Sequence, residues 1–250
     1  MQDRLRPWGR VLGLVLAVWL AWAGGWGRAL AMAPPSPLPP GAERWTLRGV
    51  KTDRKVVALT FDISWGTVMP PKVFAILERE HVPATMFVSG PWAGRQGADL
   101  VRRMAAAGME VESHGWAHVN YTGLSDQGVQ DNIRRAGAVI RQLTGRDPRF
   151  VRPPNGDFSP RTLAAARAVG YTTVTWGTDS LDWMNPGVDT IIRRVVTRVH
   201  PGDIVLLHAS DTCKQTDLAL PAIIRDLRAR GYQLVTLEQL LQTGTPDFRD

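Results

Sequence analysis

The sequence contains one cysteine, Cys213, in 250 residues. A single cysteine cannot form a disulfide within the chain, and Cys213 has no metal-ligating neighbours in the sequence. We therefore expect a packed or incidental thiol rather than a nucleophile. The glycine-rich fingerprints of dinucleotide-binding and phosphate-binding loops are also absent, so the sequence offers no support for a nucleotide-binding fold. Histidine is scarce too, with five in the whole chain, so a closely spaced pair is informative.

The N-terminal segment has the pattern of a targeting signal. Arginines at positions 4, 6 and 10 precede an apolar run over residues 11–23, and small residues follow at 29–31. This pattern predicts export, with residues 1–31 either cleaved as a signal peptide or retained as an anchor, because the uncharged stretch 11–27 is at the lower limit for crossing a bilayer core of ~30 Å. Residues 32–43 are rich in proline, which favours an extended linker. Residues 44–250 are long enough for one domain with its own core.

The chain is basic, with a formal net charge of +7, part of which lies in the N-terminal segment. A mildly basic exported domain suits an anionic polymer of the cell envelope, although a solvated arginine-rich surface gives the same composition. For an extracellular or cell-envelope protein we expect no nucleic-acid partner. We expect contact with a membrane only through residues 1–31, if they stay uncleaved, and a monomeric state.

Apolar, strand-like runs alternate with amphipathic stretches along residues 44–250. The expected strands cover residues 56–61, 84–89, 109–112, 149–151, 172–176, 204–207 and 234–236. Amphipathic stretches at 126–143, 159–169 and 188–199 predict helices, the second with Ser159 and Pro160 placed as N-cap and first helical residue. Glycines at 108, 170 and 231 close several helical stretches. The alternation predicts an α/β fold with about seven parallel strands in a closed or nearly closed barrel, with an open doubly wound sheet as the alternative.

The first and third of these strands end in residues suited to metal-assisted chemistry. Asp62 follows the first strand, and His114 and His118 follow the third. Chemistry in α/β folds gathers at the carboxyl ends of parallel strands, so these groups are expected to face one cleft. On a helical turn, a spacing of four would place both imidazoles on one face, about 6 Å apart along the axis, where both could bind one metal ion.

The next three strands also end in polar groups. The residues that follow them are Arg152 in a stiff RPPNG loop, Asp179 and Asp182 in TDSLDW, and His208 in LLHASD. Separately, each could be a capping aspartate, an ordinary turn or a satisfied core histidine. Their succession at one strand end after another predicts an active site.

The order and spacing of these motifs resemble the polysaccharide deacetylase family, also called carbohydrate esterase family four or the NodB homology domain. The resemblance covers nearly all of residues 55–241 and rests on TFDISWG at 60–66, SHGWAH at 113–118, RPPNG at 152–156, TDSLDW at 178–183, LLHASD at 206–211 and GYQLVTLEQLL at 231–241. It implies a distorted (β/α) barrel and metal-assisted hydrolysis of an N-acetyl group on an amino sugar.

The resemblance also implies a role for each matching residue. The implied roles are a general base at Asp62 paired with Arg152, metal ligands at His114 and His118, an oxyanion donor at the Asn155 backbone N–H, an acid at His208 oriented by Asp182, and a sugar contact at Trp183. The expected cofactor is a divalent metal, with zinc as the first choice. The form FDISWG, with SGPWA at 89–93, resembles the sporulation-associated branch, which implies a peptidoglycan-related role in spore formation.

One position departs from the family pattern in a way that bears on activity. The family has two adjacent aspartates, the second being the third metal ligand, and this chain has Ile63 there. Gly115 also replaces the usual Ser or Thr. Catalytic zinc sites carry three protein ligands, so a site with two histidines is expected to bind metal weakly unless another group completes it.

The sequence therefore supports one main function and two alternatives. The main expectation is an exported hydrolase that removes N-acetyl groups from amino sugars of peptidoglycan or a chitin-like polysaccharide. The alternative is a catalytically degenerate glycan-binding or structural protein of the envelope or spore. The replacement of a metal-ligating aspartate by Ile63 favours this alternative. Hydrolysis of a small-molecule amide is the third possibility, because the same groups would serve any acyl amide.

Overall fold

The computed structural model describes residues 44–249. The expected targeting segment at 1–31 and the linker at 32–43 lie outside the described residues. Within residues 44–249, no helix combines the length and apolar character needed to cross a membrane.

Within this part of the chain ten strands belong to one sheet. They are β1 (Thr46–Lys51), β2 (Val56–Ile63), β3 (Thr85–Val88), β4 (Glu110–Ser113), β5 (Phe150–Val151), β6 (Thr172–Thr173), β7 (Thr178–Asp179), β8 (Asp203–His208), β9 (Gln233–Val235) and β10 (Thr245–Arg249). All seven expected strands are present, with shifted ends. Three more, β1, β7 and β10, were not expected from the sequence.

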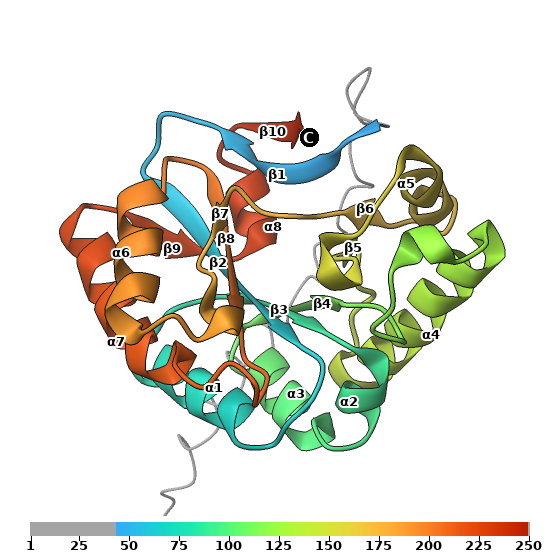
Figure 1. Cartoon of the computed structure of the whole chain (residues 1–250), viewed down its shortest axis with the longest axis horizontal. Coiled ribbons are helices and arrows are strands. Elements are labelled where there is room, and N and C mark those ends of the chain that lie inside the picture. Colours follow the sequence, from blue (N-terminus) through green and yellow to red (C-terminus); the bar gives the residue numbers. More distant parts are fainter. Residues whose placement is uncertain (1–43, 250) are drawn as a thin grey trace, which may run out of the picture. The chain divides into compact units, whose positions relative to one another are not determined.

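Helices surround the sheet (Figure 1). They are α1 (Met69–Arg79), α2 (Gly90–Gly94), α3 (Ala98–Ala106), α4 (Asp126–Thr144), α5 (Pro160–Arg167), α6 (Val188–Arg198), α7 (Thr216–Ala229) and α8 (Leu237–Leu241), with the 3₁₀ turns η2 (Tyr121–Gly123), η3 (Pro154–Gly156) and η4 (Asp182–Met184). The three helices expected from amphipathic spacing are α4, α5 and α6. Ser159 caps α5 through a reciprocal capping box with Thr162, and proline follows it, as expected.

The strand pairings explain why the sheet curls into a barrel. β2 pairs in parallel with β8 along one side, and on its other side with β9 near its start and β3 near its end. The sheet continues through β4 and β5 to β6. β1 fills the remaining gap, since it lies antiparallel to β8 and bridges to Val174 just after β6. The backbone N–H of Thr175 donates to the Leu47 carbonyl at 3.0 Å across that seam. The expected barrel of parallel strands is confirmed.

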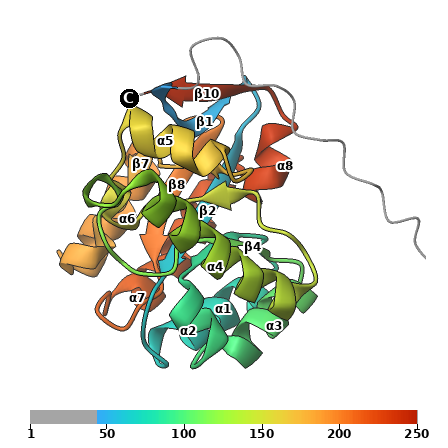
Figure 2. The same cartoon turned by 90° about the vertical axis from the view of Figure 1, so that its right-hand side faces the viewer.

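The two faces of β2 lie in different surroundings. Leu59, Phe61 and Ile63 are fully buried in an apolar cluster with residues of the surrounding helices α1, α3, α6 and α7. Val56 and Ala58 belong to a second cluster, which draws on β1, β3, β5, β8, β9 and α8 and fills the inside of the barrel. Successive side chains of a strand point to opposite faces, so Asp62 projects inward while its neighbours 61 and 63 project outward. Figure 2 shows α4 and α5 packed side by side on the outside, with β1 and β10 at the top of the view.

Candidate active site

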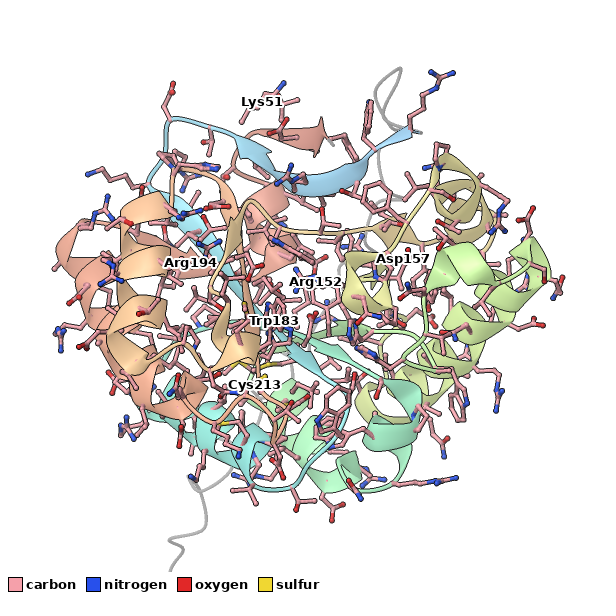
Figure 3. The ribbon with its side chains drawn as sticks, in the orientation of Figure 1. Lys51, Arg152, Asp157, Trp183, Arg194 and Cys213 are labelled. Carbon is pink, nitrogen blue, oxygen red and sulfur yellow. The ribbon has the colours of Figure 1, made fainter. Side chains whose placement is uncertain are left out.

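A cavity of about 360 Å³ lies at the carboxyl ends of the strands. Its lining residues are Asp62, Ser64, Trp65, His114, His118, Asn155, Gly156, Trp176, Asp179, Trp183, Leu206, His208, Ser210, Thr212 and Cys213. Six of the eight residues singled out by sequence line it, and the other two, Arg152 and Asp182, are fully buried and bonded to lining residues. Figure 3 places Arg152 and Trp183 near the centre of the view, with Cys213 below them.

Asp62 is held by a buried arginine. The Arg152 guanidinium donates to Asp62 Oδ1 at 2.8 Å and to the Thr175 carbonyl at 3.0 Å, and it stacks over the Phe87 ring at 4.2 Å. Burial alone would raise the pKa of Asp62, but nearby positive charge, chiefly that of the Arg152 guanidinium, outweighs it and lowers the pKa. Asp62 is therefore an ionised carboxylate with one oxygen bound to arginine.

The two strand-end histidines are neutral, and the ring of His114 has a defined orientation. His114 Nδ1 lies 2.8 Å from the Arg152 carbonyl, which can only accept, so Nδ1 carries the hydrogen and Nε2 the lone pair. His114 Nε2 is 3.8 Å from Asp62 Oδ2, and the rings of His114 and His118 are 5.3 Å apart. Burial lowers the pKa of His114 to about 4 and also lowers that of His118. Neutral imidazoles whose second nitrogen is anchored are the form that binds a metal.

The expected helical turn between the histidines is absent. Residues 114–118 form a loop that opens at Gly115, with φ of 76°. A Cβ atom at Gly115 would lie 2.5 Å from Asn132 Oδ1 and 2.5 Å from the Tyr121 hydroxyl. The glycine found in place of the family's Ser or Thr thus suits both the backbone angle and the close packing of this loop.

A third protein ligand for a metal is missing from the cavity. Ile63 has no exposed surface and belongs to the apolar layer outside β2. Nearby carboxylates are engaged elsewhere: Glu112 accepts from the backbone of Arg149 and Phe150, and Asp157 accepts from Thr122. Within residues 44–249, no three imidazole, thiolate or carboxylate groups form a ready metal site. The donor chemistry of His114 and His118 fits a divalent ion, with the remaining positions left to water or substrate.

The acid half of the site is tightly organised. His208 Nδ1 lies 2.7 Å from Asp182 Oδ1, while the backbone N–H of His208 and the Thr216 hydroxyl donate to Asp182 Oδ2 at 2.8 and 2.7 Å. Burial alone would lower the pKa of His208, but the hydrogen bond and charge of Asp182 raise it overall. β2 and β8 are in register at Asp62 and His208, which puts the two side chains on one cavity. Leu181 adopts a left-handed backbone, with φ of 58°, directly before Asp182.

The RPPNG loop reaches the cavity through Asn155 and Gly156. Asn155 has a left-handed φ of 60°, which asparagine tolerates, and its side chain donates to Asn120 Oδ1 at 2.7 Å. A Cβ at Gly156 would lie 2.7 Å from the Trp176 ring. The loop is thus fixed by close packing, and the oxyanion role of the Asn155 N–H stays a prediction.

Several cavity residues were not assigned a site role from the sequence. Trp65 packs edge-on against His118 with ring centres 5.3 Å apart, and its indole N–H donates to the Thr212 hydroxyl at 3.3 Å. Trp176 and Asp179 also line the wall. The signal in the sequence that could have assigned these residues to the site was their position at the ends of strand-like runs. Cys213 is 1% exposed, and burial raises its pKa to about 12, which matches the expected packed thiol.

Comparison with known proteins gives consistent results. The family model described as polysaccharide deacetylase matches residues 49–174. The chain is 31% identical to a peptidoglycan-N-acetylglucosamine deacetylase of Bacillus cereus, over 82% of this chain and 95% of that protein. It is 28% identical to the uncharacterized protein YlxY of Bacillus subtilis over 76% of this chain, and it spans only 58% of that relative's length.

Solved structures agree with this assignment. BA3943 of Bacillus anthracis, described as a CE4 family pseudoenzyme, superposes with a TM-score of 0.73 and 29% identity, over 80% of this chain and 70% of that one. A mutant of BA3943 is described as having restored enzymatic activity. An acetyl xylan esterase of Clostridium thermocellum in complex with a cobalt ion gives a TM-score of 0.70 and 32% identity, over 75% and 91% of the two chains. The motifs, the barrel and these matches together show that the chain belongs to the polysaccharide deacetylase family.

Proposed function

We propose that this protein is an exported hydrolase that removes N-acetyl groups from amino sugars of peptidoglycan or a chitin-like polysaccharide. The observation that carries the proposal is that one cavity holds both a base and an acid. The base is the ionised Asp62, which is paired with Arg152. The acid is His208, whose pKa is raised by its partner Asp182. The N-terminal targeting pattern supports an extracellular or cell-envelope location, and the FDISWG motif supports a role in spore formation.

The chemistry can be assigned to this chain's own residues. Asp62 takes a proton from the water whose oxygen attacks the acetyl carbon. The Asn155 backbone N–H stabilises the negative charge that develops on the carbonyl oxygen. His208 gives its proton to the amide nitrogen as the C–N bond breaks, releasing acetate and a free amino sugar. Trp183, 51% exposed at the cavity, offers a flat apolar face to a sugar ring.

His114 and His118 would hold the divalent metal. When bound, the metal would polarise the acetyl carbonyl and lower the pKa of the attacking water. Because Ile63 supplies no ligand, we expect the affinity for Zn²⁺ to be lower than in a site with three protein ligands.

The first prediction concerns Asp62. We expect the full-length chain to release acetate from chitotetraose or purified peptidoglycan when Zn²⁺ or Co²⁺ is added, and much less with chelator. Asp62→Asn should lower the rate by about 10²–10⁴-fold, because the general base is lost. Acetate is measured by an enzyme-coupled assay, and Asp157→Asn, which alters an aspartate outside the cavity, is the control. Unchanged release by Asp62→Asn would rule out the assigned base.

Ile63 favours a second candidate, a catalytically degenerate protein that binds glycan without hydrolysing it. It is supported by the missing third ligand and by the similarity to a CE4 family pseudoenzyme. Glycan binding by the folded chain, with no acetate released under any metal condition, would favour this candidate over the deacetylase.

A further inference from the structure

Two loops at the carboxyl ends of the strands hold each other in place. The β2–α1 loop (residues 64–68) follows the strand that carries the proposed base, and the β8–α7 loop (residues 209–215) follows the strand that carries the proposed acid. Figure 1 shows α1 and α7, the helices that these loops enter, side by side. Figure 3 labels Cys213 in the second loop. Contacts between the loops therefore connect the two halves of the site.

Three consecutive side chains of the β8–α7 loop bond to the β2–α1 loop or to the start of α1. Ser210 Oγ accepts from the Ser64 backbone N–H at 3.1 Å, and Thr212 Oγ1 accepts from the Trp65 indole N–H at 3.3 Å. Asp211, which lies between them, makes the most hydrogen bonds of the three. The connection between the loops thus depends chiefly on this carboxylate.

Asp211 caps α1 from outside the helix. Its Oδ1 accepts from the backbone N–H groups of Met69 at 2.7 Å and Val68 at 3.0 Å, and its Oδ2 accepts from that of Thr67 at 3.1 Å. Met69 is the first residue of α1, and Val68 before it makes no side-chain cap. Asp211 therefore satisfies N–H groups that the start of a helix leaves unpaired.

The Asp211 carboxylate is ionised and closely packed against the loop. Burial alone would raise the pKa of Asp211, but the three backbone hydrogen bonds, with the charge of Lys72, outweigh it and lower the pKa. Gly66 has a φ of 99°, and a Cβ atom there would collide with the Asp211 carboxylate. Glycine at this position thus permits both the backbone angle and the close approach of the carboxylate.

The loop that Asp211 holds also contains Trp65, which contacts the histidine pair. The rings of Trp65 and His114 each lie 5.3 Å from the ring of His118, measured between ring centres. Trp65 is 41% exposed, so its position depends on its loop rather than on deep burial. Asp211 is not one of the described residues that line the cavity, so any effect that it has on His118 passes through Trp65.

Building on the proposed function, we propose that Asp211 is a positioning residue that keeps Trp65 packed against His118 and thereby keeps the His118 ring oriented for the metal. Loss of the Asp211 carboxylate leaves the start of α1 uncapped and frees Trp65 to move away from His118.

The first measurement is the NMR signal of the His118 ring in chelator, which depends on neither metal binding nor catalysis. The full-length chain, with its five histidines, is labelled with ring-¹³C histidine, and His118→Gln identifies the signal. Trp65→Ala should move this signal, because the tryptophan ring shields or deshields nearby protons. Asp211→Ala should move it in the same direction. Asp211→Asn, which keeps an acceptor oxygen but loses the charge, should move it less.

The second measurement is the affinity for Zn²⁺, determined by competition with a chelating dye. Asp211→Ala should weaken binding by about tenfold, the low end of the loss expected when a group that orients a metal ligand is removed. In the Trp65→Ala background, Asp211→Ala should weaken binding little further, because the two residues act along one route.

The matched control is Thr236→Ala, which removes a helix cap that contacts no residue of the cavity. Thr236 Oγ1 accepts from the Gln239 backbone N–H at 3.2 Å and caps α8. Thr236→Ala should lower the thermal stability but leave the His118 signal and the Zn²⁺ affinity unchanged.

An unmoved His118 signal in Asp211→Ala, or full additivity of the Asp211 and Trp65 substitutions, overturns the positioning role. If Asp211→Ala does not fold, Asp211→Asn is judged by the same two outcomes. Failure of the wild-type chain to bind Zn²⁺ or to release acetate contradicts the proposed function, whereas the NMR signal decides separately whether Asp211 positions His118.

Discussion

At the scale of single residues, Asp182 determines the protonation state of the His208 ring. Asp182 accepts from the His208 ring, the His208 backbone and Thr216, and it is fully buried. Asp182→Asn removes the charge that raises the pKa of His208. The protonated acid should therefore be lost at lower pH, moving the alkaline limb of acetate release downward and lowering kcat by ~10²–10⁴-fold. Proton NMR titration of the His208 ring measures the pKa directly, and an unshifted pKa would contradict this account.

The same pKa shift links His208 to stability. Its folded pKa is raised, so the stabilisation that it contributes is fully present below the unfolded-state pKa and is lost as pH rises through the folded pKa. Asp182→Asn should make the free energy of unfolding less dependent on pH between the unfolded-state and the folded pKa of His208. Urea unfolding at several pH values measures it.

The sequence predicted the titratable groups of the site better than their surroundings. Asp62, His114 and His208 were identifiable because each stands at the end of a strand-like run in the sequence, and strand register then brings Asp62 beside His208. The hydrogen bond from the Arg194 side chain to the Asp179 carbonyl joins α6 to β7, and the loop at Gly115 depends on Asn132 and Tyr121. Such relations join residues from different elements, and no local pattern encodes them.

At the scale of elements, the end of β2 decides whether a third ligand can be supplied. Ile63 pairs with Val88 of β3, and its carbonyl accepts from the Ser89 N–H at 2.9 Å. Ile63→Asp should lower the free energy of unfolding by more than about 3 kcal/mol in chelator, because a carboxylate replaces a buried apolar side chain. Zn²⁺ should restore part of this loss, because Ile63 is the last residue of β2 and a carboxylate added to the two histidines would raise the affinity of the folded chain for the metal. Thermal unfolding with chelator and with Zn²⁺ measures both effects.

The matched control is Ile63→Asn, which has the same shape without the charge and should be destabilised with little response to Zn²⁺. A loss of stability in Ile63→Asp that Zn²⁺ leaves unchanged would mean that the side chain at 63 stays in the apolar layer.

The short strand β7 is an element that the sequence analysis did not predict. Two residues carry no detectable periodicity, so this strand was not predictable, although it positions Asp179.

At the scale of the whole described domain, β1 completes the barrel. Leu47 is 1% exposed, lies in the inner cluster, and bridges to Val174. Leu47→Ala should lower the free energy of unfolding by about 2–5 kcal/mol, whereas Val68→Ala, at a side chain 57% exposed, should change it by less than about 0.5 kcal/mol. Urea denaturation of both variants is the measurement, and equal small effects would show that β1 is not part of the cooperative unit.

The sequence predicted the parallel strands but not how the barrel closes. The apolar runs of β2 and β8 are continuous because both faces are buried. β1 and β10 pair antiparallel at the end of the sheet, and the Arg48 and Gly49 of β1 interrupt any apolar run. Closure therefore depends on a strand whose partners lie more than a hundred residues away.

The single cysteine is buried in the cavity wall, so the rate of its chemical labelling reports how often this wall opens. Cys213 is a protonated thiol with almost no exposed surface. A thiol reagent can modify the native chain only during moments when this wall opens. The labelling rate of Cys213 is therefore a measure of the opening rate of the wall. A bound glycan that holds the wall closed would lower the labelling rate in proportion to the fraction of time that the cavity is occupied.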